Sequence, residues 1–161
     1  MRGTFIVALG LVLGLTPGPR GASAQLPQRP VLTLEAATRI ADAAQAEATR
    51  NQWNVVIAVV DDGGHVVHLR RMDGTQVGSV VVAQEKAKSA ILFRRPTKAF
   101  ADAVASGRTA VLRLPGAIPI EGGVPLAQGA QIVGAIGVSG VTSEQDGQIA
   151  HAGVRAFSAA R

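Results

Sequence analysis

Two short basic clusters carry the side chains best suited to chemistry in this chain. The first is Arg70-Arg71-Met72-Asp73-Gly74, and the second is Arg94-Arg95-Pro96-Thr97. Paired arginines bind carboxylates, and a methionine thioether can ligate the iron of a haem. The same residues are equally typical of solvated charges where a strand or a helix ends. The clusters therefore indicate an anion site only if other elements place them around a common hollow.

The histidines give a weaker signal. His65 stands beside turn glycines and, with Asp73, is a candidate acid or base, although a histidine at a turn end also commonly bonds only to backbone. His68 follows three residues later on a predicted strand, and this odd spacing places the two rings on opposite faces. His151 is remote in the sequence. We expect no metal site built from protein side chains alone.

The first 24 residues have the pattern of a secretory signal peptide. A positive start at Met1-Arg2 precedes an apolar run over 4–15, a Pro/Gly break, and the small residues Ala22-Ser23-Ala24. A spanning helix needs about 20 apolar residues, so this run is too short for a stable membrane anchor. We expect residues 1–24 to be cleaved and the mature protein to be periplasmic or secreted.

Residues 25–161 have the length of one domain, since 137 of the 161 residues remain after cleavage. The chain has no cysteine, which excludes disulfides, thiolate metal sites and covalent c-type haem attachment. The mature part holds 14 basic and 11 acidic residues. So small an excess, with few aromatic residues, argues against nucleic acid as a partner.

Hydrophobic periodicity and turn residues predict an α+β domain with a single antiparallel sheet and helices packed on its faces. The region 108–123, rich in glycine and proline, is expected to be mostly irregular and to form a binding loop. Thr97 is expected to cap the short helix that follows it. The other predicted elements are a helix over 33–51, a hairpin of 54–60 with 65–72, helices over 79–93 and 98–105, a second hairpin of 124–127 with 131–139, and a last helix from the capping box Thr142–Gln145 to about 157.

Four segments, taken in order, resemble the GlcG/HbpS family of haem-binding and haem-degrading-like domains. With the first predicted helix, the resemblance covers nearly all of residues 32–157. The segments are IAVVDDGGHVVHLRRMDG at 57–74, AQEKAKSAILFRRPT at 83–97, PGAIPIEGGVPL at 115–126 and IVGAIGVSGVTSEQDGQIAHAG at 132–153.

The resemblance implies a profilin- or PAS-like sheet and a homo-oligomer. Secreted members of the family bind haem, which makes haem a possible cofactor here, whereas other members sit in operons for small organic acids and have no settled activity. Thr97 stands nearest to a threonine described as a haem ligand in one secreted member. Other haem-binding relatives use a histidine on the first helix, and residues 33–51 contain none. Haem would then be ligated by Thr97, Met72 or His65. Its propionates would be held by arginines such as Arg71, Arg94 or Arg95, beside a recess lined by Gly122 and Gly123.

Three functions remain open at this point. The protein is a haem- or small-ligand-binding protein, a carrier or an accessory to a sensor. Alternatively, it is an enzyme acting on haem or a small organic acid, with its site between the loop 115–125 and the neighbouring Arg71 and Asp73. A third alternative is a non-catalytic interaction module for a sensor protein.

Overall fold

The computed structural model describes residue 26 and residues 28–159, so the predicted signal peptide lies outside the described residues. Within them, four strands form one antiparallel sheet in the order β2-β1-β4-β3. The elements are α1 (Leu34–Arg50), β1 (Val56–Asp61), β2 (Val66–Arg71), α2 (Ser79–Phe93), α3 (Lys98–Ala105), the 3₁₀ helix η1 (Thr109–Arg113), β3 (Gly123–Gln128), β4 (Gln131–Ser139) and α4 (Ser143–Ala159). The predicted α+β class with a single antiparallel sheet is confirmed.

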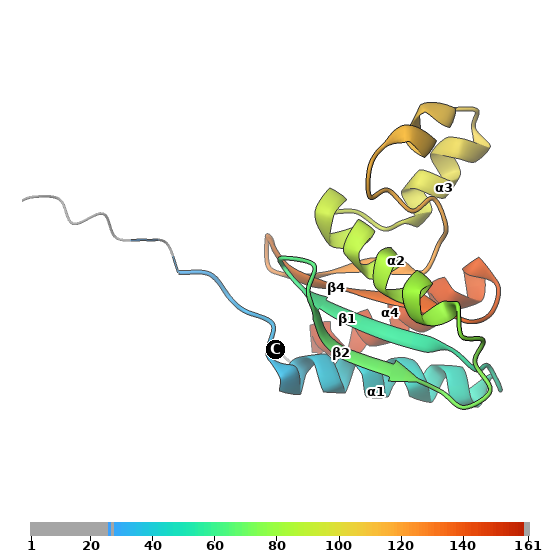
Figure 1. Cartoon of the computed structure of the whole chain (residues 1–161). Helices are drawn as coiled ribbons and strands as arrows, with labels where there is room; N and C mark the ends of the chain where they lie inside the picture. The colour runs from blue at the N-terminus through green and yellow to red at the C-terminus, as the bar shows by residue number, and fades with distance from the viewer. Residues whose placement is uncertain (1–25, 27, 160–161) are drawn as a thin grey trace, which may run out of the picture.

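Each face of the sheet has its own helical cover (Figure 1). Alternate residues of β1 point to opposite faces. Ile57 and Val59 join the core under α1 and α4, whereas Ala58 and Val60 pack against α2. This two-sided burial explains why the strand has an uninterrupted β-branched and apolar sequence.

Two of the helix starts follow the predicted capping chemistry. The Thr33 hydroxyl accepts a hydrogen bond from the Ala36 N–H, at 3.2 Å, before α1. Thr142 and Gln145 bond reciprocally before and within the first turn of α4, at 3.2 and 3.4 Å. The capping box is therefore confirmed.

Small residues bring α2 unusually close to the sheet. A Cβ atom on Gly137 of β4 would lie only 2.0 Å from the carbonyl oxygen of Ala83. Ala83 and Ala87 are fully buried on the side of α2 that faces the sheet. Here the helix backbone itself packs on the strand, which an amphipathic stripe of large residues would prevent.

Two predictions about local structure, the Thr97 cap and the strand position of His65, need correction. Thr97 precedes α3 but makes no capping hydrogen bond with its side chain. The region 108–123 is mostly irregular, as expected, although it contains η1. His65 lies before β2 rather than in it, and the pairing of β1 with β2 shifts register between Val59 and Val60. The odd-spacing argument for His65 and His68 assumed an unbroken strand, and it does not hold across this irregularity.

The α3–η1 segment projects beyond the edge of the sheet (Figure 1). Phe100 of α3 is buried against Phe93 at the end of α2, with ring centroids 5.1 Å apart. In the described part of the chain, no helix is both long and apolar enough to cross a membrane.

Candidate functional site

The first basic cluster lies at the outer edge of β2. A hollow of about 380 Å³ is lined there by Gln45, Asn54, Arg70, Arg71, Met72 and Asp73. Arg70 is committed to α1, where it donates to the Asp42 carboxylate at 2.7 Å and to the Gln45 side-chain oxygen at 2.8 Å. Arg71 donates to the Thr75 carbonyl at 2.8 Å. Both guanidinium groups therefore already make hydrogen bonds within the protein.

The second basic cluster lies at the end of α2, beside a larger hollow of about 500 Å³, which we call the Arg94 hollow. Arg94 adopts a left-handed conformation (φ 53°) that ends α2. Among the described residues, its guanidinium makes no hydrogen bond or ion pair. The hollow is lined by Arg29, Pro30, Asp62, Ile91, Leu92, Arg94, Gln131, Ile132 and Val133.

The walls of the Arg94 hollow combine charge with apolar surface. Arg29 forms an ion pair with Asp62 at its rim. Ile91 and Leu92 extend the wall from the last turn of α2, and Ile132 does so from the start of β4. The hollow's volume of about 500 Å³ is within the usual range of small-molecule sites, and its lining is more polar than is usual for them.

Arg95, although next in sequence, takes a different direction. It does not line the Arg94 hollow. Its guanidinium carbon lies 5.7 Å from the centroid of the Phe100 ring, which is a cation–π geometry. The structure therefore separates the two arginines of this cluster, and it assigns only Arg94 to a hollow.

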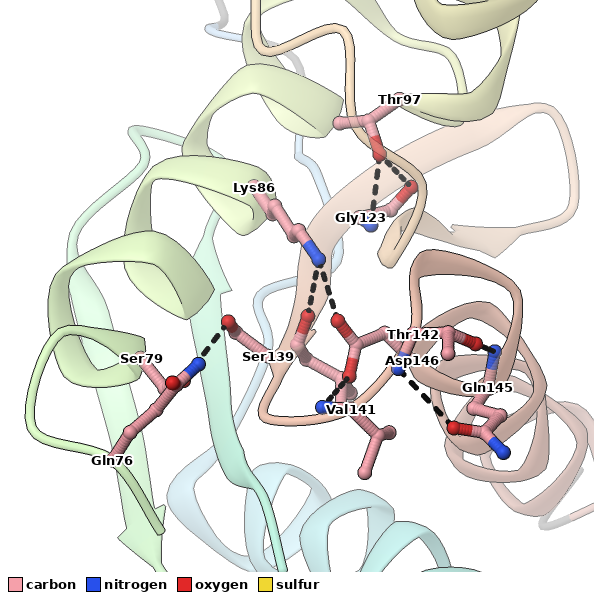
Figure 2. Close-up of polar contacts among 11 residues, drawn as sticks. Gln76, Ser79, Lys86, Thr97, Gly123, Ser139, Val141, Thr142, Gln145 and Asp146 are labelled. Carbon is pink, nitrogen blue, oxygen red and sulfur yellow. Dashed lines mark hydrogen bonds and ion pairs between the residues drawn. The ribbon is translucent and has the colours of Figure 1, made fainter.

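Thr97 and Gly123 are joined by hydrogen bonds (Figure 2), and Gly122 precedes this joint in the chain. The Thr97 hydroxyl accepts a hydrogen bond from the Gly123 N–H at 3.0 Å, and the Thr97 side chain is fully buried. A Cβ on Gly123 would lie 2.2 Å from the Lys86 carbonyl oxygen. At Gly122 (φ 127°), a Cβ would lie 2.7 Å from the Val138 carbonyl oxygen. The expected glycine-lined recess is thus filled by the protein's own atoms.

A buried ion pair lies beside this joint. The Lys86 ammonium donates to the Asp146 carboxylate at 2.8 Å and to the Val138 carbonyl at 3.0 Å. Burial raises the pKa of the Asp146 carboxyl, and the nearby Lys86 ammonium acts in the opposite direction. Sequence reasoning missed this pair, although Lys86 lies on the α2 face that carries Ala83 and Ala90, so its burial was readable from the helical period.

The histidines stand apart from both hollows. The His65 N–H donates to the Asp61 carboxylate at 2.9 Å, and the side chain is exposed in the turn between β1 and β2. His68 is half-buried, and its Nε2 has no hydrogen-bond partner within the described structure. Burial lowers the pKa of His68, as does the charge of Arg70, whereas Asp42 opposes the shift. No group of three or more potential ligand residues could hold a metal ion in residues 28–159.

The predicted site residues therefore divide between opposite edges of the sheet. Arg71, Met72 and Asp73 adjoin the β2 edge, whereas Thr97, Gly122 and Gly123 adjoin the β3 edge. Arg71 and Asp73 were expected to neighbour the loop 115–125. Within a single chain they do not, because they adjoin the opposite edge of the sheet. Arg94, by contrast, lines a hollow of mixed polar and apolar character that sequence reasoning did not describe.

Comparison with known proteins gives this geometry a family context. Over residues 32–155 the chain matches the model of a family described as haem degrading protein HbpS-like. Protein GlcG of Escherichia coli (strain K12) is 47% identical over 109 residues, which are 68% of this chain and 81% of GlcG.

Two solved structures share the fold at full domain length. An HbpS double mutant from Streptomyces reticuli has a TM-score of 0.75 and 33% identity, covering 88% of this chain and 97% of that one. PduOC in complex with haem has a TM-score of 0.71 and 26% identity, covering 79% of this chain and 95% of that one. The family match spans most of the chain, and close relatives share its sequence and fold. This chain belongs to the HbpS-like family.

Proposed function

We propose that this protein binds haem, or a related ring that carries carboxylates, reversibly in the Arg94 hollow. The observation that carries the proposal is Arg94 itself, a cation without a partner among the described residues, which stands over an apolar wall. The family description names haem, and PduOC, a structural neighbour, was solved with haem bound.

The hollow suits the two chemical parts of such a ligand. The side chains of Ile91, Leu92 and Ile132 offer apolar surface to a flat ring, whose burial supplies most of the binding free energy. The Arg94 guanidinium offers a bidentate partner for a ring carboxylate. Arg29 would serve a second carboxylate by exchanging its bond to Asp62.

The residues of the Arg94 hollow suit the ring and its carboxylates, but they offer no ligand for the iron. The side chains that line the Arg94 hollow include no histidine, methionine, cysteine or tyrosine. Met72 adjoins the β2 edge, and the Thr97 hydroxyl already bonds to Gly123. When bound, haem supplies a redox-active iron, and the protein side chains described here hold the ring around it. Such a site favours loading and release, as a carrier or a sensor accessory requires, over electron transfer.

The location of this activity is part of the proposal. The signal-peptide pattern in residues 1–24 supports export. An exported binder would meet haem in the periplasm or the medium and deliver it, or report it, to another protein. A sensor protein as that recipient remains a prediction.

Haem titration of the purified mature chain, followed by the Soret absorption, tests the proposal. Binding should saturate at one haem per chain. Arg94→Gln should weaken binding about tenfold, because one charge-assisted carboxylate contact is lost. Arg95→Gln is the matched control, since Arg95 lies over Phe100 outside the hollow, and its affinity should equal that of the wild type. Equal affinities for all three proteins, or no saturation, would contradict the proposal.

A further inference from the structure

The outward face of α2 carries an unusual stripe. Val81, Glu85, Lys88 and Leu92 recur at intervals of four, three and four residues, which places all four side chains on one narrow face of the helix. Val81 is 63% exposed and Leu92 is 53% exposed. This spacing is that of a coiled-coil seam. Lys88 is exposed as well, whereas Glu85 is half-buried. We call these four residues the α2 seam.

The charges of the seam lack partners. Neither Glu85 nor Lys88 makes a hydrogen bond or ion pair with another described residue. They occupy the middle of the seam, with one apolar residue beyond each of them. Along the helix, the seam therefore begins with the apolar Val81, continues with the acidic Glu85 and the basic Lys88, and ends with the apolar Leu92.

This order is self-complementary under a two-fold rotation. If a second copy of α2 packs antiparallel, with the rotation axis midway between Glu85 and Lys88, Val81 faces the partner's Leu92 and Glu85 faces the partner's Lys88. Each contact occurs twice, as an isologous interface requires. Helices in such contacts lie 8–10 Å apart, within reach of these side chains.

We propose that the α2 seam is a homodimer interface in which two antiparallel α2 helices pair Val81 with the partner's Leu92 and Glu85 with the partner's Lys88. A second copy is the occupant because the same helix, in antiparallel orientation, places an opposite charge against both Glu85 and Lys88 while covering both apolar ends.

The surroundings extend the seam. Val77, one turn before Val81, is also highly exposed. A Cβ on Gly116 would lie 3.5 Å from a methyl carbon of Leu92, so the loop after η1, with the exposed Leu114, adjoins the far end. Leu92 also lines the Arg94 hollow. The tests below avoid Leu92, so that loss of dimerisation and loss of ligand binding remain distinguishable.

Charge reversal tests the pairing directly. Molar mass by sedimentation equilibrium should show self-association of the wild type, and Glu85→Lys or Lys88→Glu should each weaken it at least tenfold, because each creates two like-charge contacts across the axis. The double variant Glu85→Lys/Lys88→Glu should associate like the wild type. An equimolar mixture of the two single variants should also associate, since the charges again alternate between the chains.

Two variants that place an aspartate at an exposed apolar position, one inside the seam and one outside it, supply the control. Val81→Asp should reduce the mass of the assembly, whereas Leu112→Asp, at an equally exposed position on η1, should not. A monomeric wild type would overturn the proposal and leave the seam to a different partner. Association unchanged by Glu85→Lys and Lys88→Glu, or a mixture that fails to associate, would overturn it as well. Circular dichroism of each variant checks that the fold is retained. We expect the wild-type spectrum, because substitutions at the surface usually change stability little.

Discussion

The Lys86 ammonium lies 2.8 Å from the Asp146 carboxylate, and the two side chains are only 1% and 3% exposed. This contact joins the middle of α2 to the first turn of α4, across the end of β4 (Figure 2). The other Asp146 oxygen accepts a hydrogen bond from the Val141 N–H at 3.3 Å. Two elements on opposite faces of the sheet are thereby held together at one point, next to the joint between Thr97 and Gly123.

Removing one member of this pair should be costly. We expect Lys86→Met and Asp146→Asn each to lower the free energy of unfolding by about 3–5 kcal/mol, because each leaves an uncompensated buried group. The double variant Lys86→Met/Asp146→Asn should lose less stability than the sum of the two single losses, since no buried charge remains. Urea denaturation at neutral pH measures this. Additive losses in the double variant would contradict the coupling.

Two of the helices that pack on the sheet, α1 and α2, show why part of the fold was predictable. Around α1, buried alanines and Ile40 recur at the helical period, and Thr33 supplies its cap, so both bounds were predicted within one residue. The α2 helix has no such contrast between faces, because small residues make its contact with the sheet and Val81 and Leu92 are exposed. Its bounds still followed from the alanine content and from Pro96.

The site was predictable only in part, for a topological reason. Side-chain chemistry identified Arg94, but neither Ile132 nor Pro30, which share its hollow, is near it in the sequence. Thr97 was expected to cap α3 or to ligate a cofactor, whereas its hydroxyl bonds to Gly123 on another element. Local sequence rules cannot anticipate which distant backbone group a hydroxyl will reach.

The contact between Thr97 and Gly123 gives a second prediction. Thr97→Val keeps the volume of the side chain but leaves the buried Gly123 N–H without its acceptor, so we expect a loss of about 1–3 kcal/mol in unfolding free energy. Thr97→Ser retains the hydroxyl and should lose less. Thermal or urea unfolding compares the variants. If Thr97→Val were as stable as the wild type, the assigned role of this hydrogen bond would be wrong.

Glu47 gives a prediction about pH. A hydrogen bond from the Gln148 amide at 2.6 Å, and then the Arg50 guanidinium, lower the pKa of Glu47 against the effect of burial. A carboxyl whose pKa is lowered by folding stabilises the native state above its unfolded pKa, about 4.3, and this contribution is lost as the pH falls through the lower folded pKa. Glu47→Gln should therefore lose less stability than the wild type between pH 5 and pH 3.

Urea unfolding at several pH values in that range measures the effect. Glu35→Gln is the control on the same helix, because the Glu35 carboxylate is exposed and pairs only with Arg39 at the surface. Its pH dependence should match that of the wild type. Parallel curves for Glu47→Gln and the wild type would show that the contact between α1 and α4 through Gln148 does not act as described.

The central claim is that the Arg94 hollow holds the ring and its carboxylates, with little contribution from the iron. The most direct measurement is a parallel titration of the mature chain with haem and with iron-free protoporphyrin. We predict saturable binding of both, with dissociation constants within about tenfold of one another and equally weakened by Arg94→Gln. Tight binding of haem alone, unaffected by Arg94→Gln, would contradict this account and indicate an iron ligand elsewhere.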